Sequence, residues 1–436
     1  MTILPRMRSD LLRGSGRKLT IIPVVIISVI FLTLVPSTVM SLSGSLPEVL
    51  RLSDGIPVTS LADWNAIRRN ELKELFQREM YGFFPEVPDL TFKIAKEDPD
   101  VLEGKATYRE VEIRFDGLGD TSMTLAIFLP NEATIPAPLI VGVGLCGNHT
   151  VLEYEGISPP RPELWLGPCK FFANGRGALA NYWSVEDIID RGYAFATYHE
   201  VELDADRKNE TDGIHGRLKP ASVEAAGGDE KAAWGTISAW AWGASRVIDY
   251  AENAADIDTS RVAVVGHSRR GKSALLAGAF DDRITLTVVH QAGTGADALS
   301  RSSLFQEPVF LMNWLYPYWF NKRFLTYNFR VRKLPMDQHE LLALVAPRTI
   351  LINAARSYRW AGFRSSVKAM RAAEPVYKLY GNEGIIGSGV ITDDDEISET
   401  TIGDLTQYRR DSGHSLDPEY WRVILDVARI TFDSSE

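Results

Sequence analysis

The hydrophobic positions of this chain follow two patterns, one with the spacing of helices and one with that of strands. Residues 59–80 repeat apolar side chains at helical spacing, and residues 234–251 mix aromatic and small residues in a strong helical pattern. Residues 108–130 alternate apolar and polar positions as two strands. Continuous apolar runs predict buried strands at residues 137–145, 190–198, 284–289, 348–353 and 375–380.

Strands separated by helical segments predict a three-layer α/β sandwich. Its strands form a mostly parallel central sheet, and its helices cover both faces. Sheets of this kind bind ligands beyond the carboxyl ends of their strands. The segment 146–186, rich in glycine, proline and aromatic residues, predicts a loop.

Residues 261–279 carry the most informative part of the pattern. A short β-branched run ends at Gly266, and helical character resumes after Gly271. Ser268 therefore lies between a strand and a helix, where backbone N–H groups can stabilise an oxyanion. The G-x-S-x-G pattern of nucleophilic serines is met with its second glycine one position late. The alternative is an ordinary serine in a strand-to-helix connection.

A serine nucleophile needs a base, normally a histidine whose other ring nitrogen is held by an acid. In α/β hydrolases the chain order is serine, acid, histidine. His414 fits this order because it follows Asp411-Ser412-Gly413 just before the predicted final helix. His267 precedes the serine directly, and its side chain is expected to point away and pack. An ordinary loop histidine is the alternative for His414.

Length and charge limit the possibilities further. With 436 residues, 45% of them hydrophobic and 24% charged, the chain is long enough for one large domain, and no repeat or low-complexity linker divides it. A net charge of −10 argues against a nucleic-acid partner, because phosphate binding needs a basic surface.

The N-terminus predicts export. A basic lead precedes the apolar run 19–40, and small residues follow it. Residues 1–43 are therefore interpreted as a signal peptide, or alternatively as a membrane anchor, since the run is long enough to span a bilayer. Residues 44–436 are expected to form a single domain that works in the periplasm or outside the cell.

Cysteine chemistry is limited to Cys146 and Cys169. Two cysteines form neither a disulfide scaffold nor a cysteine-rich zinc site. In an oxidising compartment the two could pair, and two free thiols are an equally good interpretation.

Five motifs in order give the chain a family resemblance over roughly residues 48–432. They are WGTISAWAW, GHSRRGK, LPMDQHELLALVAPR, PVYKLYG and the closing SGH. Together they resemble the bacterial glucuronoyl esterases, carbohydrate esterase family 15. The resemblance implies a secreted α/β-hydrolase that cleaves esters between glucuronic acid on xylan and lignin alcohols. It implies no metal, no organic cofactor and no protein partner.

The resemblance also implies roles for individual residues. Ser268 matches the nucleophile, His414 the base, and Arg269 the arginine that stabilises the oxyanion. Substrate-binding roles fall on three further residues, with solvent exposure or a structural role as the alternative for Lys272 and Glu307. These are Lys272, Trp360 and Glu307.

The triad acid is where the sequence departs from the family. The family places it 23 residues after the serine, where this chain has Gln291, or in a loop of the type E-D-x-W-A, which here reads ARSYRWA at residues 355–361. Neither place holds a carboxylate. Arg356 and Arg359 in that loop make this side of the cleft more positive, which suits an anionic substrate, unless both face solvent.

Three hypotheses follow from the missing acid. The acid could come from elsewhere, from Asp297 or from the acidic loop 393–396. The enzyme could instead work slowly with a Ser-His pair, with Gln291 orienting His414 without compensating its charge. It could also have lost catalysis and kept a carbohydrate-binding cleft. The leading prediction is a secreted serine esterase for glucuronate esters of polysaccharide, with an esterase for acetylated sugars as the alternative among hydrolases.

Overall fold

The computed structural model describes residues 45–133, 136–160, 169, 173, 175–208, 213–302 and 306–434. The N-terminal segment 1–43, predicted as a signal peptide or anchor, lies outside these residues. Within them, no helix combines the length and the apolar character that crossing a bilayer would require.

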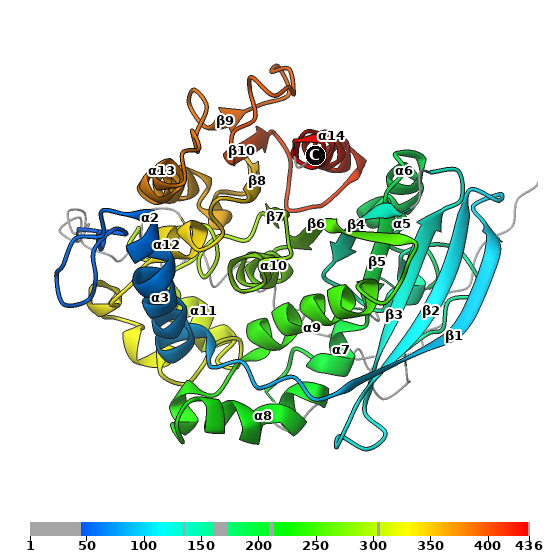
Figure 1. Ribbon diagram of the computed structural model, residues 1–436, viewed down its shortest axis with the longest axis horizontal. Helices are drawn as coiled ribbons and strands as arrows, with labels where there is room; N and C mark the ends of the chain where they lie inside the picture. The colour runs from blue at the N-terminus through cyan, green and yellow to red at the C-terminus, as the bar shows by residue number, and fades with distance from the viewer. Residues whose placement is uncertain are drawn as a thin grey trace, which may run out of the picture. The chain divides into compact units, whose positions relative to one another are not determined.

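A ten-stranded sheet organises residues 45–434, in the order β1-β2-β3-β5-β4-β6-β7-β8-β10-β9 (Figure 1). The strands β1, β2, β3 and β5 pair antiparallel, and all pairs from β5 to β9 are parallel. The bounds are β1 Leu90–Val101, β2 Ala106–Phe115, β3 Ser122–Pro130, β4 Ala137–Gly142, β5 Ala194–Tyr198, β6 Ile257–His267, β7 Leu286–His290, β8 Thr349–Ala355, β9 Val390–Ile391 and β10 Leu405–Arg410.

Helices cover both faces of this sheet (Figure 1). One face packs against a continuous N-terminal helical run and five further helices; α5, α6 and α14 pack on the opposite face. The first group is α2 Leu61–Asp63, η3 Trp64–Arg68, α3 Arg69–Phe76, η4 Gln77–Tyr81, α8 Gly213–Ala225, α9 Thr236–Ala251, α10 Arg269–Phe280, α12 Gln338–Ala343 and α13 Phe363–Leu379; the second is α5 Ala180–Trp183, α6 Val185–Asp190 and α14 Pro418–Asp433. The remaining short helices are η5 Asn148–Thr150, α7 Glu200–Leu203, η7 Glu230–Ala232, α11 Val309–Leu315, η8 Phe324–Tyr327, η9 Val331–Lys333 and η10 Arg359–Ala361.

The central strands explain why their sequences are continuously apolar. Along β6, Val262 and Val264 face one hydrophobic core, while Ala263 and Val265 face the other. A strand buried on both sides has no polar face to present, so the alternation of a half-exposed strand is lost. The predicted three-layer α/β architecture with a mostly parallel sheet is confirmed.

Two parts of the predicted element list are wrong. Residues 375–380 are the end of helix α13, in which Met370, Ala373, Val376 and Tyr377 share one buried face. A short apolar run fits a buried strand or a buried helix segment equally well, and here the helix begins well before the run. The segment 146–186 is also not all loop, since it contains η5, α5 and the start of α6.

Candidate active site

Ser268 occupies a sharp turn between β6 and α10. Its φ and ψ angles are 58° and −124°, a backbone conformation that is strained for residues other than glycine. Gly266 and Gly271 allow this turn, because a Cβ on Gly271 would lie 2.8 Å from the carbonyl oxygen of Gly266, and one on Gly266 would overlap the Arg270 carbonyl. The glycine that is one position late in the pattern is therefore the one that packs inside the turn.

His414 lies beside this serine. It belongs to the loop between β10 and α14, and its Nε2 lies 3.0 Å from Ser268 Oγ. Its Nδ1 lies 2.8 Å from Oε1 of Gln291, the first residue after β7. The structure thus joins three residues from three separate loops in the order serine, histidine, amide.

The orientation of the Gln291 amide follows from its surroundings. Its Nε2 donates to the carbonyl oxygens of Gly413 and Ser415, at 3.2 and 3.3 Å, and to the hydroxyl of Tyr420 at 3.2 Å. The amide nitrogen is surrounded by acceptors, so the amide oxygen must face His414. His414 then carries its proton on Nδ1 and presents the lone pair of Nε2 to the serine, as a general base requires.

The hypothesis that a carboxylate from elsewhere completes the triad is wrong for the part of the chain that the structure describes. Asp297 accepts from Gly293 N at 2.8 Å and from the Ser366 hydroxyl, and burial raises its pKa to about 6. In the acidic loop, Asp393 accepts from the Tyr408 hydroxyl. The acceptor on His414 Nδ1 is the neutral Gln291 amide.

Two rings pack against the imidazole of His414. The Tyr358 ring stacks on the His414 ring with 4.0 Å between ring centres, and the centre of the His267 ring lies 4.3 Å from that of His414. His267 packs as predicted, and what it packs against is the base itself. Burial, together with the charges of Lys272 and Arg269, lowers the pKa of His414 to about 4. The imidazole is therefore neutral, and hence competent as a base, at every pH well above 4.

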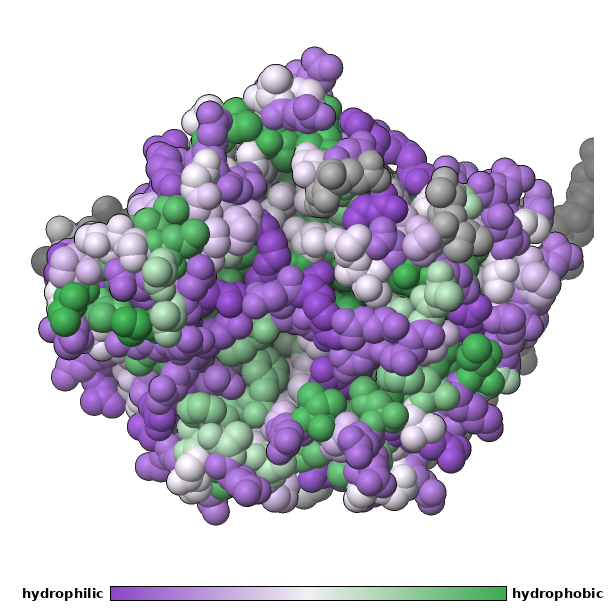
Figure 2. Space-filling model, viewed as in Figure 1, coloured by the Kyte–Doolittle hydropathy of each residue, from purple (hydrophilic) through white to green (hydrophobic). Residues whose placement is uncertain are grey.

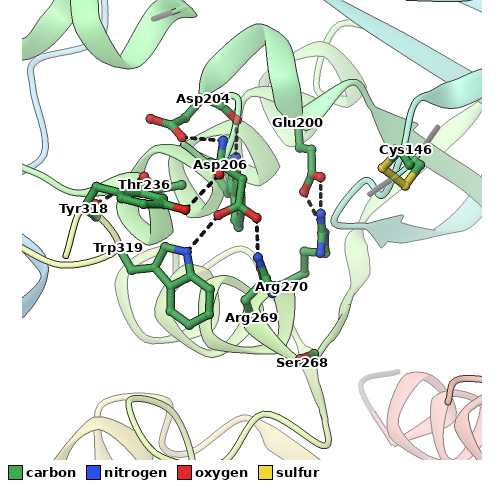
Figure 3. Close-up of polar contacts among 12 residues, drawn as sticks. Cys146, Glu200, Asp204, Asp206, Thr236, Ser268, Arg269, Arg270, Tyr318 and Trp319 are labelled. Atoms are coloured by element: carbon green, nitrogen blue, oxygen red, sulfur yellow. Dashed lines mark hydrogen bonds and ion pairs between the residues drawn. A yellow bond between two sulfur atoms is a disulfide. The ribbon is translucent and has the colours of Figure 1, made fainter. Parts of the chain in front are cut away.

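Arg269 is clamped by a residue that the sequence pattern did not reveal. Its guanidinium pairs with the Asp206 carboxylate, which also accepts from Trp319 Nε1 at 2.8 Å (Figure 3). The guanidinium lies over the rings of Trp319 and Tyr316, at 4.6 and 4.9 Å. Asp206 itself has a φ of 53°, which aspartate tolerates better than most residues. No local motif surrounds Asp206, so only the fold brings it to Arg269.

Arg270 forms a second ion pair behind the serine (Figure 3). Its Nε and Nη2 atoms both donate to the Glu200 carboxylate, and the distance from Nε to Oε2 is 2.6 Å. Nε also donates to the Gly144 carbonyl oxygen at 3.1 Å. This bidentate pair ties α10 to the segments that follow β4 and β5. It fixes the start of the helix on which Ser268 depends.

The three predicted substrate-binding residues lie together. Lys272 is only 2% exposed, and its ammonium group donates to the carbonyl oxygens of Ala292, at 2.8 Å, and Thr294. It also lies 3.6 Å from the Glu307 carboxylate, and Glu307 N donates to the Trp360 carbonyl at 3.0 Å. Trp360 is 39% exposed, so of the three it offers the most surface to a ligand.

Cys146 and Cys169 form a disulfide, which decides the question that the sequence left open. Cys146 lies in the loop after β4, and β4 pairs directly with β6, the strand that leads to Ser268. In α/β hydrolases a loop in this position donates a second N–H to the oxyanion. The disulfide therefore anchors the loop that follows β4, the neighbour of the strand that leads to Ser268.

Comparison with known proteins places this architecture in a family. A family model described as glucuronyl esterase, fungi, matches residues 227–381. Carbohydrate esterase MZ0003, from an unknown prokaryotic organism, is 37% identical over 88% of this chain and 89% of its own length. A 4-O-methyl-glucuronoyl methylesterase from Phanerochaete carnosa is 28% identical over 81% of this chain and 77% of its own.

Solved structures agree with the sequence relatives. A promiscuous CE15 esterase from a marine bacterial metagenome superposes with a TM-score of 0.77, at 36% identity, over 89% of this chain and 97% of its own. A glucuronoyl esterase from Solibacter usitatus gives a TM-score of 0.79 at 31% identity, over 90% of this chain and all of its own. The protein has the α/β-hydrolase fold of these enzymes. It is a carboxylic ester hydrolase and belongs to carbohydrate esterase family 15, the glucuronoyl esterases.

Proposed function

We propose that this protein is an exported serine esterase that hydrolyses glucuronate esters of polysaccharides, with a Ser268-His414-Gln291 relay in place of a triad with an acid. The observation that carries the proposal is the continuous hydrogen-bonded line from Ser268 Oγ through His414 to the Gln291 amide. The names of the relatives, glucuronoyl esterases and methylesterases, support the substrate class.

The chemistry proceeds in two acyl-transfer steps. Ser268 Oγ attacks the ester carbonyl carbon while His414 Nε2 takes the hydroxyl proton. The negative charge that develops on the carbonyl oxygen is stabilised by Arg269 and by N–H groups at the start of α10. The tetrahedral intermediate then collapses, His414 returns the proton to the leaving alcohol, and the uronate remains esterified to Ser268. Water, activated by His414 in the same way, releases the free acid and restores the serine.

Gln291 contributes orientation but no charge. In serine proteases, replacing the triad aspartate by asparagine lowers turnover by about 10⁴, because the wrong histidine tautomer is stabilised. Here the amide oxygen faces Nδ1, so the productive tautomer is kept. The transient imidazolium lacks a carboxylate partner, and turnover is therefore expected to be slower than in relatives with an acid.

Export is part of the proposal. The basic and apolar N-terminal segment has the composition of an export sequence. The Cys146–Cys169 disulfide is typical of a protein that works in an oxidising compartment. A polysaccharide substrate would be met in the same compartment.

Hydrolysis of benzyl glucuronate by protein lacking residues 1–43 tests the activity, with Ser268→Ala as its control. Turnover that falls by at least about 10³ in the variant supports the proposal. Equal turnover by both proteins, or hydrolysis only of acetylated sugars, contradicts it. Binding of glucuronate without any turnover would instead point to a carbohydrate-binding protein on an esterase scaffold.

A further inference from the structure

Three arginines gather without a carboxylate at the carboxyl ends of β8 and β10. Arg356 follows β8, Arg409 lies near the end of β10, and Arg364 lies in the first turn of α13. Most arginines in the described part of the chain form ion pairs, but these three form none there. In a protein with a net charge of −10, positive charges left together in this way point to an anion supplied from outside.

Two of the three arginines pack against the ring of Phe363. The guanidinium of Arg409 lies 4.6 Å from the centre of its ring, and that of Arg364 lies 5.7 Å from it. Gln407 fixes both partners, since its Nε2 donates to the Phe363 carbonyl at 2.8 Å and its Oε1 accepts from Arg409 Nε at 3.1 Å. Arg409 is partly buried, whereas Arg356 and Arg364 are exposed.

In the described part of the chain, no carboxylate neutralises the positive charges of the cluster. Burial and the charges of Arg356 and Arg364 lower the pKa of Arg409. The neighbouring carboxylates are engaged elsewhere: Asp417 pairs with Arg410 at 2.7 Å, and Asp411 accepts from the Ser357 hydroxyl at 2.6 Å. Helix α13 begins at Phe363 with no side-chain cap, so its N-terminus adds to the positive potential.

One loop links the cluster to the candidate active site. The loop after β8 begins with Arg356 and also contains Trp360 and Tyr358, whose ring stacks on His414. β8 lies two strands from β6 in the sheet, and β10 lies three, which places their ends about 10 and 14 Å along the sheet from the strand of Ser268. A single sugar at Ser268 cannot reach so far, whereas an oligosaccharide can. Figure 2 shows hydrophilic and hydrophobic residues mixed over the upper left of the molecule, where Figure 1 places α13.

We propose that Arg356, Arg364 and Arg409 form a subsite for a second anionic substituent, a sulfate or a carboxylate, on the polysaccharide whose ester is cleaved at Ser268. Guanidinium groups bind both oxyanions through paired N–H donors. This inference rests on the proposed function, because it concerns another part of the same substrate. It implies that the natural polymer carries acidic groups beyond the esterified uronate.

Calorimetric titration of the Ser268→Ala protein tests the subsite without turnover. The probes are an oligogalacturonate, a sulfated galactan oligosaccharide and a neutral xylo-oligosaccharide. Tighter binding of either anionic probe than of the neutral one, weakened at least about tenfold by Arg364→Gln with Arg409→Gln, supports the subsite. The probe that binds more tightly identifies the anion. Anionic probes that bind no more tightly than the neutral one, or that are insensitive to the double variant, overturn it.

Two controls keep the result interpretable. Arg332→Gln removes an exposed positive charge on η9, away from the cluster, and should leave binding of all three probes unchanged. Arg364→Lys with Arg409→Lys keeps the charge and should retain part of the lost affinity, which a merely misfolded cluster would not. Benzyl glucuronate hydrolysis by the parent protein is scored separately, so a failed esterase and a failed anion subsite give different outcomes.

Discussion

The two halves of the active site treat charge in opposite ways. Around Ser268, each cation has a carboxylate partner: Asp206 holds Arg269, Glu200 holds Arg270, and Glu307 lies near Lys272. Around His414, the direct neighbours are neutral, namely the Gln291 amide, the Tyr358 ring and the half-buried His267 imidazole. Ion pairs therefore surround Ser268, whereas two rings and a neutral amide surround His414.

This difference indicates where the proposed mechanism stabilises the transition state. In that mechanism the oxyanion would form next to the N-terminus of α10 and the Arg269 guanidinium, which Asp206 holds in place. In the same mechanism the imidazolium would form on His414, whose direct neighbours are neutral and whose pKa is lowered by desolvation and by the charges of Lys272 and Arg269. The proposed mechanism therefore stabilises mainly the substrate oxygen, while His414 acts through its position and its tautomer.

Removing the amide should have the largest effect. Gln291→Met keeps the side-chain volume but deletes the acceptor on His414 Nδ1, so His414 loses its fixed tautomer and orientation. We expect kcat to fall by about 10²-fold, less than the roughly 10⁴-fold cost of an unproductive tautomer in a charged triad. Steady-state kinetics with benzyl glucuronate measure this, and an unchanged kcat would show that Gln291 is only structural.

Adding a charge at the same position sharpens the comparison. Gln291→Glu should raise the pKa of His414, so the acidic limb of the pH profile of kcat/KM should move up from about 4 by at least about one unit. The variant should also be less stable, because a carboxylate would face the carbonyl oxygens of Gly413 and Ser415. An unchanged acidic limb would mean that a carboxylate at position 291 does not change the pKa of His414.

On the serine side, Asp206→Asn should have a smaller effect. Asparagine keeps an acceptor for Trp319 and tolerates the positive φ, but it removes the charge that clamps Arg269. We expect kcat to fall about tenfold, with little change in KM, because the guanidinium still stacks on Trp319 and Tyr316. Asp426→Asn, which removes the charge that pairs with Arg191 and Arg422 far from the site, serves as the matched control and should change neither constant. A fall in kcat as large in the control would assign the effect to net charge.

A further prediction concerns stability at acid pH, where the activity assays above give no information. Burial lowers the pKa of His414 and His149 to about 4, and that of His290 and His199 to about 3, from an ordinary value near 6.5. The unfolded chain therefore binds more protons than the native protein below about pH 6.5. The contribution of these neutral histidines is complete above that pH and is lost as the pH falls toward 4. Thermal unfolding between pH 7 and 4.5 should show a falling Tm, and a constant Tm would contradict the buried neutral state.

Predictability from sequence differed between the two sides. Ser268 and His414 were found because each lies in a short pattern next to an apolar strand or a helix. Gln291 was found only by its spacing from the serine within a family resemblance. Asp206, Glu200 and Tyr358 were missed, because their roles come from contacts with residues far away in the chain. Residues 375–380 were assigned to a strand because a short apolar run has no period of its own.

The sequence by itself determined the layered α/β fold and the strand-turn-helix around Ser268, since both depend on local hydrophobic spacing and on glycines that admit a tight turn. It also excluded a carboxylate from the two places where the family keeps its acid. Only the tertiary structure decided that Cys146 and Cys169 pair, that Asp206 holds Arg269, and that Gln291 faces His414 across 123 positions of chain. Those contacts depend on where separate strands end in the sheet, and neither composition nor spacing contains that information.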